Sequence, residues 1–187
     1  MSVRRVIGGC FVTLLLSAQG LIAAGSDIAD AAMNKNRDVV RSLLQKKADV
    51  NAPQVDGTTA LHWAVRADDL ETADLLIRAG ANVSAANREA VTPMQLAAIN
   101  GSALMLEKMI KAGANPNASL SKFGDTALML AARTGKSNAV KLLLDNGGDI
   151  NAIETWGGTT PLMWAVSERH LDGLDPTCRP REAAFTF

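Results

Sequence analysis

The residues of this chain that could take part in chemistry are two histidines, one Gly-Lys-Ser turn and two cysteines. His62 and His170 lie in unrelated contexts, and neither belongs to an HExxH zinc pattern. The segment 134–137 (Thr-Gly-Lys-Ser) resembles the end of a phosphate-binding loop, but Leu130 stands where that loop requires a glycine. Paired-cysteine spacing and a nucleophile elbow are both absent from the sequence. We therefore expect no catalytic residue, no cofactor and no metal site, and no enzyme activity.

A short sequence pattern recurs along the chain and indicates how the chain folds. Four copies begin with a threonine followed by an apolar, alanine-rich segment, at residues 59–65, 92–98, 126–132 and 160–166. Their first threonines are 33, 34 and 34 residues apart. Self-similarity at a fixed period of this length is typical of proteins built from stacked repeats.

Each copy predicts a pair of helices. The opening threonine can cap the first free backbone N–H groups, and Pro93 and Pro161 suit the first helical position. Gly80, Gly113 and Gly147 follow the second apolar segment, where a left-handed residue ends a helix. One helix pair cannot bury its apolar face alone, so neighbouring pairs must stack. The small residues that allow close stacking are Ala64, Ala97, Ala131 and Ala165.

On these residues the chain resembles the ankyrin-repeat family, whose pattern is a turn, a helix opened by T-P-L-H-x-A, and a second helix. The resemblance covers residues 26–172 and implies an all-α solenoid of stacked helix-turn-helix units joined by β-turn loops. The first unit, a degenerate copy, is a candidate N-terminal cap. The expected repeats are residues 26–51, 52–85, 86–118 and 119–152, followed by a partial repeat at 153–172.

The repeat pattern stops after Asp172. Pro176 falls in the middle of the expected second helix of the fifth repeat, where an interior proline costs about 3 kcal/mol or more. We expect that this helix does not form and that residues 173–187 are an irregular tail or a truncated repeat. The stack would then end on an uncapped helix. The tail, a partner or a second copy of the chain could cover it, so self-association through this end is one expectation.

The first 25 residues have the order of a secretory signal peptide. Arg4 and Arg5 precede an apolar run at 6–16, and small residues follow up to Gly25. The alternative is an uncleaved membrane anchor at residues 6–24. The resemblance to ankyrin-repeat proteins, combined with export, favours the bacterial periplasm, with secretion as the other destination.

Charge limits the class of partner. Loss of Arg4 and Arg5 with the signal reduces the basic residues from 19 to 17 against 19 acidic residues, a formal charge of −2. Nucleic-acid affinity depends on a basic surface, so we expect no nucleic-acid partner. A membrane contact is expected only if the N-terminal segment is not cleaved.

The resemblance implies a partner-binding surface made by the turn tips and the inner face of each first helix. Phe123 and Trp156 are notable there, since exposed aromatic residues often anchor interfaces. The alternative for each residue alone is an ordinary solvated turn position. The implied residues are Val55, Asp56, Thr58, Arg66, Arg88, Glu89, Val91, Asn100, Lys122, Phe123, Asp125, Arg133, Thr134, Thr155, Trp156 and Glu168.

Four other residues are expected to have structural roles. His62 is expected to form hydrogen bonds at the start of its helix, because Gln95, Met129 and Met163 replace it in the other copies. Trp63 and Trp164 share one helix position and are expected to pack in the core. Ala90 stands where another copy has Gly57, so a left-handed turn there would strain it.

Together these features predict a non-catalytic protein–protein interaction module, an exported scaffold that binds a protein partner not identified by the fold. Two alternatives remain open: a scaffold tethered to the membrane by its N-terminal segment, and an enzyme with an unrecognised site.

Overall fold

A computed structural model describes residues 27–119 and 123–167, and within these ranges every regular element is an α-helix. Each complete repeat contributes two helices, and the fifth contributes one in the described part. The helices are α1 (Asp27–Met33), α2 (Arg37–Gln45), α3 (Ala60–Arg66), α4 (Leu70–Arg78), α5 (Pro93–Asn100), α6 (Ala103–Lys111), α7 (Ala127–Arg133), α8 (Ser137–Asp145) and α9 (Pro161–Ser167).

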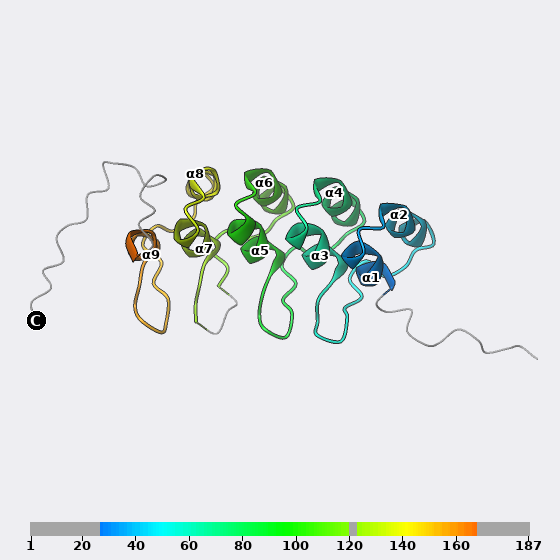
Figure 1. The fold of residues 1–187 in the computed structure, drawn as a ribbon, viewed down its shortest axis with the longest axis horizontal. Coiled ribbons are helices and arrows are strands. Elements are labelled where there is room, and N and C mark those ends of the chain that lie inside the picture. The colour runs from blue at the N-terminus through cyan, green and yellow to red at the C-terminus, as the bar shows by residue number, and fades with distance from the viewer. Residues whose placement is uncertain (1–26, 120–122, 168–187) are drawn as a thin grey trace, which may run out of the picture.

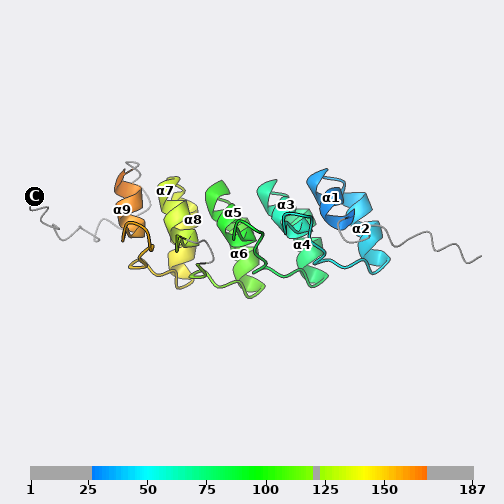
Figure 2. The same ribbon diagram turned by 90° about the horizontal axis from the view of Figure 1, so that it is seen from below.

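The helices lie in two parallel rows (Figures 1 and 2). The inner row is α1, α3, α5, α7 and α9, in which each helix contacts the next. The outer row is α2, α4, α6 and α8, and each outer helix packs on the inner helix of its own repeat. Long turns project from the side of the inner row, at the bottom of Figure 1. This arrangement confirms the predicted all-α ankyrin solenoid.

The expected helix signals are in place. The hydroxyl groups of Thr92 and Thr126 each accept a hydrogen bond, at 3.3 Å, from the backbone N–H three residues further on. Gly80, Gly113 and Gly147 end the outer helices with φ of 90°, 93° and 84°, in the left-handed region.

The core lies between the two rows. The alanine column of the inner helices, Ala64, Ala97, Ala131 and Ala165, is at most 1% exposed. Because these side chains are so small, successive inner helices can approach closely. Larger side chains of the outer helices, such as Leu76 and Leu143, fill the space between the rows and are fully buried.

A ladder of asparagine side chains links neighbouring repeats beyond the outer helices. Asn51 donates from Nδ2 to the carbonyl oxygen of Gly80 at 3.1 Å and accepts from the N–H of Asn82 at 2.7 Å. Asn117 makes the same two bonds, at 2.8 and 2.7 Å, to Gly147 and to the residue two positions later. Ser84 occupies the intervening position, and its side chain makes neither bond. The ladder therefore has a gap between the second and third repeats.

The turns contain the strain expected at Ala90, whose φ is 60°. Glycines with φ of 84°, 84° and 67° occupy this position in the other turns: Gly57, Gly124 and Gly158. A side chain in the left-handed region is unfavourable, so Ala90 adopts the turn at a cost that its glycine counterparts avoid.

Some predictions fall outside the described residues. They are the signal peptide at 1–25, the irregular tail at 173–187, the missing second helix of the fifth repeat, and the site residues Lys122 and Glu168. Among the described helices, none has the length and apolar character needed to cross a membrane.

Candidate protein-binding surface

The turns between repeats are closed hairpins held side by side. Backbone bonds from Gln54 to Thr58 (2.8 Å) and from Glu154 to Thr159 (3.1 Å) close two of them. Neighbouring tips are also joined, since the N–H of Arg88 donates to the carbonyl oxygen of Asp56 at 2.9 Å. The N–H of Thr155 donates to the carbonyl oxygen of Phe123 in the same way, at 2.7 Å. The described turn tips are therefore joined in two pairs, those of the second and third repeats and those of the fourth and fifth.

His62 connects an inner helix to the next turn. Its Nδ1 accepts from the N–H of Thr59 at 3.2 Å, which places the ring proton on Nε2, 3.1 Å from the carbonyl oxygen of Val91. Burial lowers the pKa of His62 and favours its neutral form. Gln95 makes the equivalent bonds, to Thr92 at 3.0 Å and to the next turn at 3.4 Å. The expected bonds at the helix start are thus present, and the bridge to the next repeat is additional.

Glu154 is a residue that sequence reasoning missed. It is 5% exposed, and its carboxylate accepts from the N–H of Trp156 at 2.6 Å and from that of Gly157 at 2.7 Å. It also accepts from the N–H and the hydroxyl of Thr159, at 3.2 and 2.9 Å. These donors, the Trp156 N–H first, lower the pKa of Glu154. A glutamate before a turn with two glycines is the signal that could have identified it. Its carboxylate fixes the turn that presents Trp156.

Two aromatic side chains stand at the turn tips of the fourth and fifth repeats. Trp156 is 87% exposed and Phe123 is 44% exposed. Their ring centroids lie 6.2 Å apart with the ring planes tilted by 51°, a favourable aromatic geometry. Neither is part of the buried core, so the fold does not require them there.

Two hollows open between the turn tips and the inner helices. The first, of about 500 Å³, is lined by Trp63, Arg66, Glu89 and neighbouring residues. In it the Arg66 guanidinium lies 5.6 Å from the centre of the Trp63 ring, while the indole N–H donates to Gln54 at 2.7 Å. Trp63 is only partly buried against the core.

The second hollow, of about 470 Å³, is lined by Phe123, Arg133, Trp156 and Trp164, among others. Arg133 of α7 lies 5.1 Å from the centre of the Trp164 ring of α9. The indole N–H of Trp164 donates to the hydroxyl of Thr159 at 2.6 Å. Like Trp63, Trp164 packs against the core but also lines the concave surface. Core packing was therefore only part of the role of each tryptophan.

The structure divides the predicted binding residues by exposure. Thr58 is 7% exposed, and its hydroxyl donates to the Asp56 carboxylate at 2.8 Å, so it supports the turn. Thr134 donates to a carbonyl oxygen of its own helix, and Asn100 to that of Val65 in the previous repeat. Val91 and Asp125 are half-buried. The exposed residues are Val55, Asp56, Arg66, Arg88, Glu89, Asn100, Phe123, Arg133, Thr155 and Trp156.

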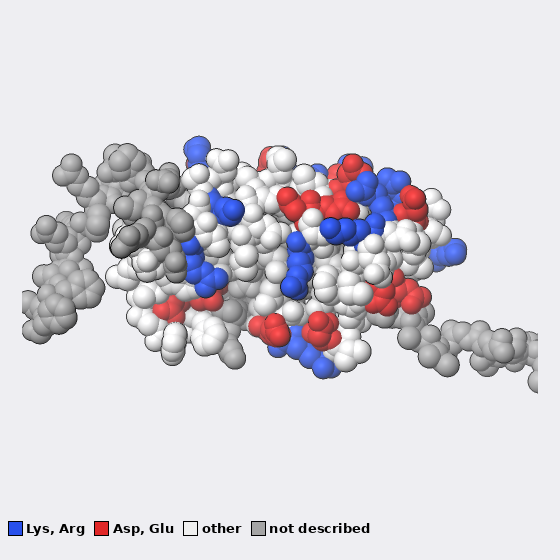
Figure 3. Space-filling model, in the orientation of Figure 1, with Lys and Arg blue, Asp and Glu red and all other residues white. Residues whose placement is uncertain are grey.

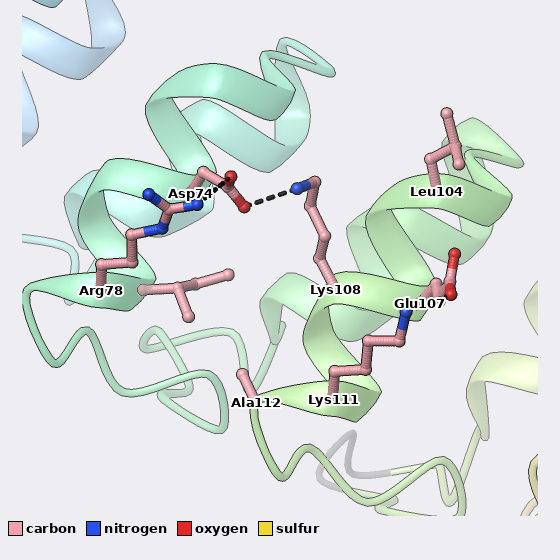
Figure 4. A pocket seen from close by; sticks show the side chains of 8 residues that line it. Asp74, Arg78, Leu104, Glu107, Lys108, Lys111 and Ala112 are labelled. Atoms are coloured by element: carbon pink, nitrogen blue, oxygen red, sulfur yellow. Dashed lines mark hydrogen bonds and ion pairs between the residues drawn. The ribbon is translucent and has the colours of Figure 1, made fainter.

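A groove on the opposite, convex side has a structural explanation. It lies between α4 and α6 and contains Asp74, which accepts from Lys108 at 2.5 Å and pairs with Arg78 at 3.4 Å (Figure 4). Glu107 and Lys111 also pair with each other. These cations and carboxylates therefore neutralise one another and join two repeats. On the side shown in Figure 3, acidic and basic residues are likewise interleaved over the outer helices.

The described side chains offer no metal centre. Among residues 27–119 and 123–167, no three His, Cys, Asp or Glu side chains are grouped to hold an ion.

Comparison with known proteins gives a family match and several partial relatives. The model for ankyrin repeats (3 copies) matches residues 28–119 and 94–175. The B-cell lymphoma 3 protein homolog of Mus musculus is 34% identical over 117 residues, which cover 61% of this chain and 26% of that protein. The nuclear factor NF-kappa-B p105 subunit of Gallus gallus is 32% identical over 140 residues, 73% of this chain and 14% of its own length.

A third relative is the transient receptor potential cation channel subfamily A member 1 homolog of Caenorhabditis elegans. It is 29% identical over 159 residues, which cover 78% of this chain and 13% of that protein. Across these three relatives, the chain spans no more than 26% of the matched protein.

Proposed function

The chain belongs to the ankyrin-repeat family, and from that premise we propose that it is a non-catalytic module that binds a protein partner through its turn tips and concave helix face. Ankyrin repeats generally mediate protein–protein interaction, and the two hollows between the tips and the inner helices give this surface relief.

The observation that carries the proposal is the exposure of Trp156 and Phe123 at neighbouring turn tips. Exposed aromatic side chains are costly to hydrate and are enriched among the residues that dominate interfaces. Both carboxylate oxygens of Glu154 accept hydrogen bonds from the turn that carries Trp156, and these bonds fix the shape of the turn. A pre-shaped turn that presents an apolar side chain to solvent is suited to binding.

Photo-crosslinking tests which face binds. A photoreactive amino acid would replace Val55 at a turn tip in one variant and Arg78 on the convex side in another; both side chains are exposed. The variants would be produced in the native host. We expect a defined crosslinked product from the turn-tip position only. Products from the convex position alone would contradict the proposal.

A double substitution separates binding from folding. The double variant Phe123→Ala with Trp156→Ala should bind the partner identified by crosslinking at least tenfold more weakly, since interface aromatics often contribute about 2 kcal/mol or more. The thermal melt followed by circular dichroism should change little, because both rings are exposed. A collapsed melt would show that the two rings support the fold. The matched control is Leu104→Ala, an apolar side chain on the convex side that is 60% exposed.

We also propose that the chain is exported, on the order of charged, apolar and small residues at 1–25. A fusion of these residues to a reporter enzyme that is active only outside the cytoplasm should give activity. Substituting the apolar run at 6–16 with polar residues should abolish it. The intact mass of the extracted protein distinguishes a cleaved chain beginning near Ser26 from a tethered one.

A further inference from the structure

We propose that the second hollow, lined by Phe123, Arg133, Trp156 and Trp164, binds a partner segment that presents a large apolar side chain beside a carboxylate. This inference rests on the proposed function and adds the chemistry of the partner. It follows from the apolar walls of the hollow and from the charges that line it.

The apolar part of the proposal comes from the aromatic walls. Phe123 and Trp156 hold their rings 6.2 Å apart and tilted by 51°, and Trp164 forms the wall on the inner helix α9. The volume of about 470 Å³ is sufficient for a phenylalanine or leucine side chain. Covering these rings would remove apolar surface from water, which is the main favourable term in most associations.

The carboxylate part comes from Arg133. Its guanidinium lies against the Trp164 ring at 5.1 Å, and in the described part of the chain no carboxylate pairs with it. The two acids that line the same hollow are both engaged: Glu154 accepts four hydrogen bonds, and Asp125 also has an interaction partner. Of the three charged side chains that line this hollow in the described structure, Arg133 is thus the one that makes neither an ion pair nor a hydrogen bond. A stacked guanidinium keeps its N–H edge free for a carboxylate, which it can bind through two parallel bonds.

The first hollow provides an internal comparison. Arg66 also lies against a tryptophan ring, that of Trp63 in its own helix, at 5.6 Å, but the exposed carboxylate of Glu89 lines that hollow too. Within residues 27–119 and 123–167, no ion pair engages Glu89. An incoming carboxylate would meet a like charge there, so the first hollow is not expected to accept the same segment. Arg66 is therefore the matched control for Arg133.

The test uses four fluorescein-labelled twelve-residue peptides with a Gly-Ser background and a central Phe-Asp, Phe-Asn, Phe-Lys or Ser-Asp pair. Fluorescence anisotropy would report their binding to the purified chain at low salt. We expect Phe-Asp to bind at least fivefold more tightly than Phe-Asn, and both Phe-Lys and Ser-Asp to bind more weakly still.

Variants assign the binding to the hollow. Arg133→Gln should make Phe-Asp and Phe-Asn bind equally, and Trp156→Ala should weaken both, while Arg66→Gln should leave the Phe-Asp preference within twofold of the parent. Melts followed by circular dichroism would confirm that each variant is folded. Equal binding of Phe-Asp and Phe-Lys, a preference lost in Arg66→Gln, or no binding by any peptide would each overturn the inference.

The proposed function can survive that failure. Crosslinking of a protein partner at the turn tips, together with no preference among the peptides, would reject the apolar–carboxylate chemistry alone. Absence of crosslinking at the turn tips would reject the binding surface itself.

Discussion

Filling the gap in the asparagine ladder should stabilise the stack. Ser84 stands where Asn51 and Asn117 each make two hydrogen bonds to the next repeat. In Ser84→Asn, the periodicity would place the new amide against the carbonyl oxygen of Gly113 and the N–H of Asn115. The serine side chain is exposed and makes no side-chain bond in the described structure, so the substitution removes nothing.

The magnitude follows from the existing rungs. Each net intramolecular hydrogen bond contributes about 0.5–1.5 kcal/mol, and exposure places these bonds toward the lower value. Ordering the new side chain costs a few tenths to about 1 kcal/mol. Two such bonds, less this ordering cost, should raise the free energy of unfolding by about 0.5 kcal/mol. For a chain of this size, that corresponds to roughly 1–2 °C in the melting temperature.

Urea unfolding followed by far-ultraviolet circular dichroism measures the change, with the m-value checked for constancy. Asn117→Ser is the reciprocal variant and should lose a similar amount, whereas Ser84→Ala should behave as the parent. If Asn117→Ser is destabilised and Ser84→Asn remains at the parent value, the rung is not transferable and the reasoning from periodicity is refuted.

Four further substitutions test the fold. Burial lowers the pKa of His62 from 6.5. As the pH falls below 6.5, the unfolded chain therefore binds a proton that the folded chain resists, and the free energy of unfolding decreases. His62→Gln should reduce the difference between the urea midpoints measured at pH 7.5 and pH 5.5. Ala90→Gly should raise the free energy of unfolding by roughly 0.5–1 kcal/mol by relieving a φ of 60°, and Gly57→Ala should lower it, both measured in urea. Ala131→Asp should cost about 3 kcal/mol or more, because it places an unpaired charge at a fully buried position, and a melt equal to that of the parent would contradict the helix packing.

The fold could be predicted from the sequence because the residues that begin and end each helix recur in every complete repeat. Thr92, Pro93 and Gly113 each mark one boundary of a helix, and the same marks recur in the other copies. A single copy would leave the choice between helix and strand open, but several copies in register leave little freedom. Even the strain at Ala90 could be predicted, since glycine stands at that position in other repeats.

The surface was less accessible, because exposure depends on where neighbouring repeats place their side chains. Thr58 lies in a turn yet is 7% exposed, and its hydroxyl is bonded to Asp56. Glu154 is a charged turn residue whose carboxylate accepts hydrogen bonds within its own turn. Arg133 stacks on Trp164 of the following repeat, a contact that spacing within one repeat cannot indicate.

The bonds between neighbouring turn tips bear on how such a chain can change during evolution. The Arg88 N–H donates to Asp56 between the turns of the second and third repeats. The Thr155 N–H donates to Phe123 between the turns of the fourth and fifth repeats, each of which is one residue longer. Because only backbone atoms form this connection, mutation can replace the tip side chains or lengthen the turn while the inner helices keep their stacking. Two descendants of one such gene could therefore diverge fully in the partners they recognise and still have superimposable helices.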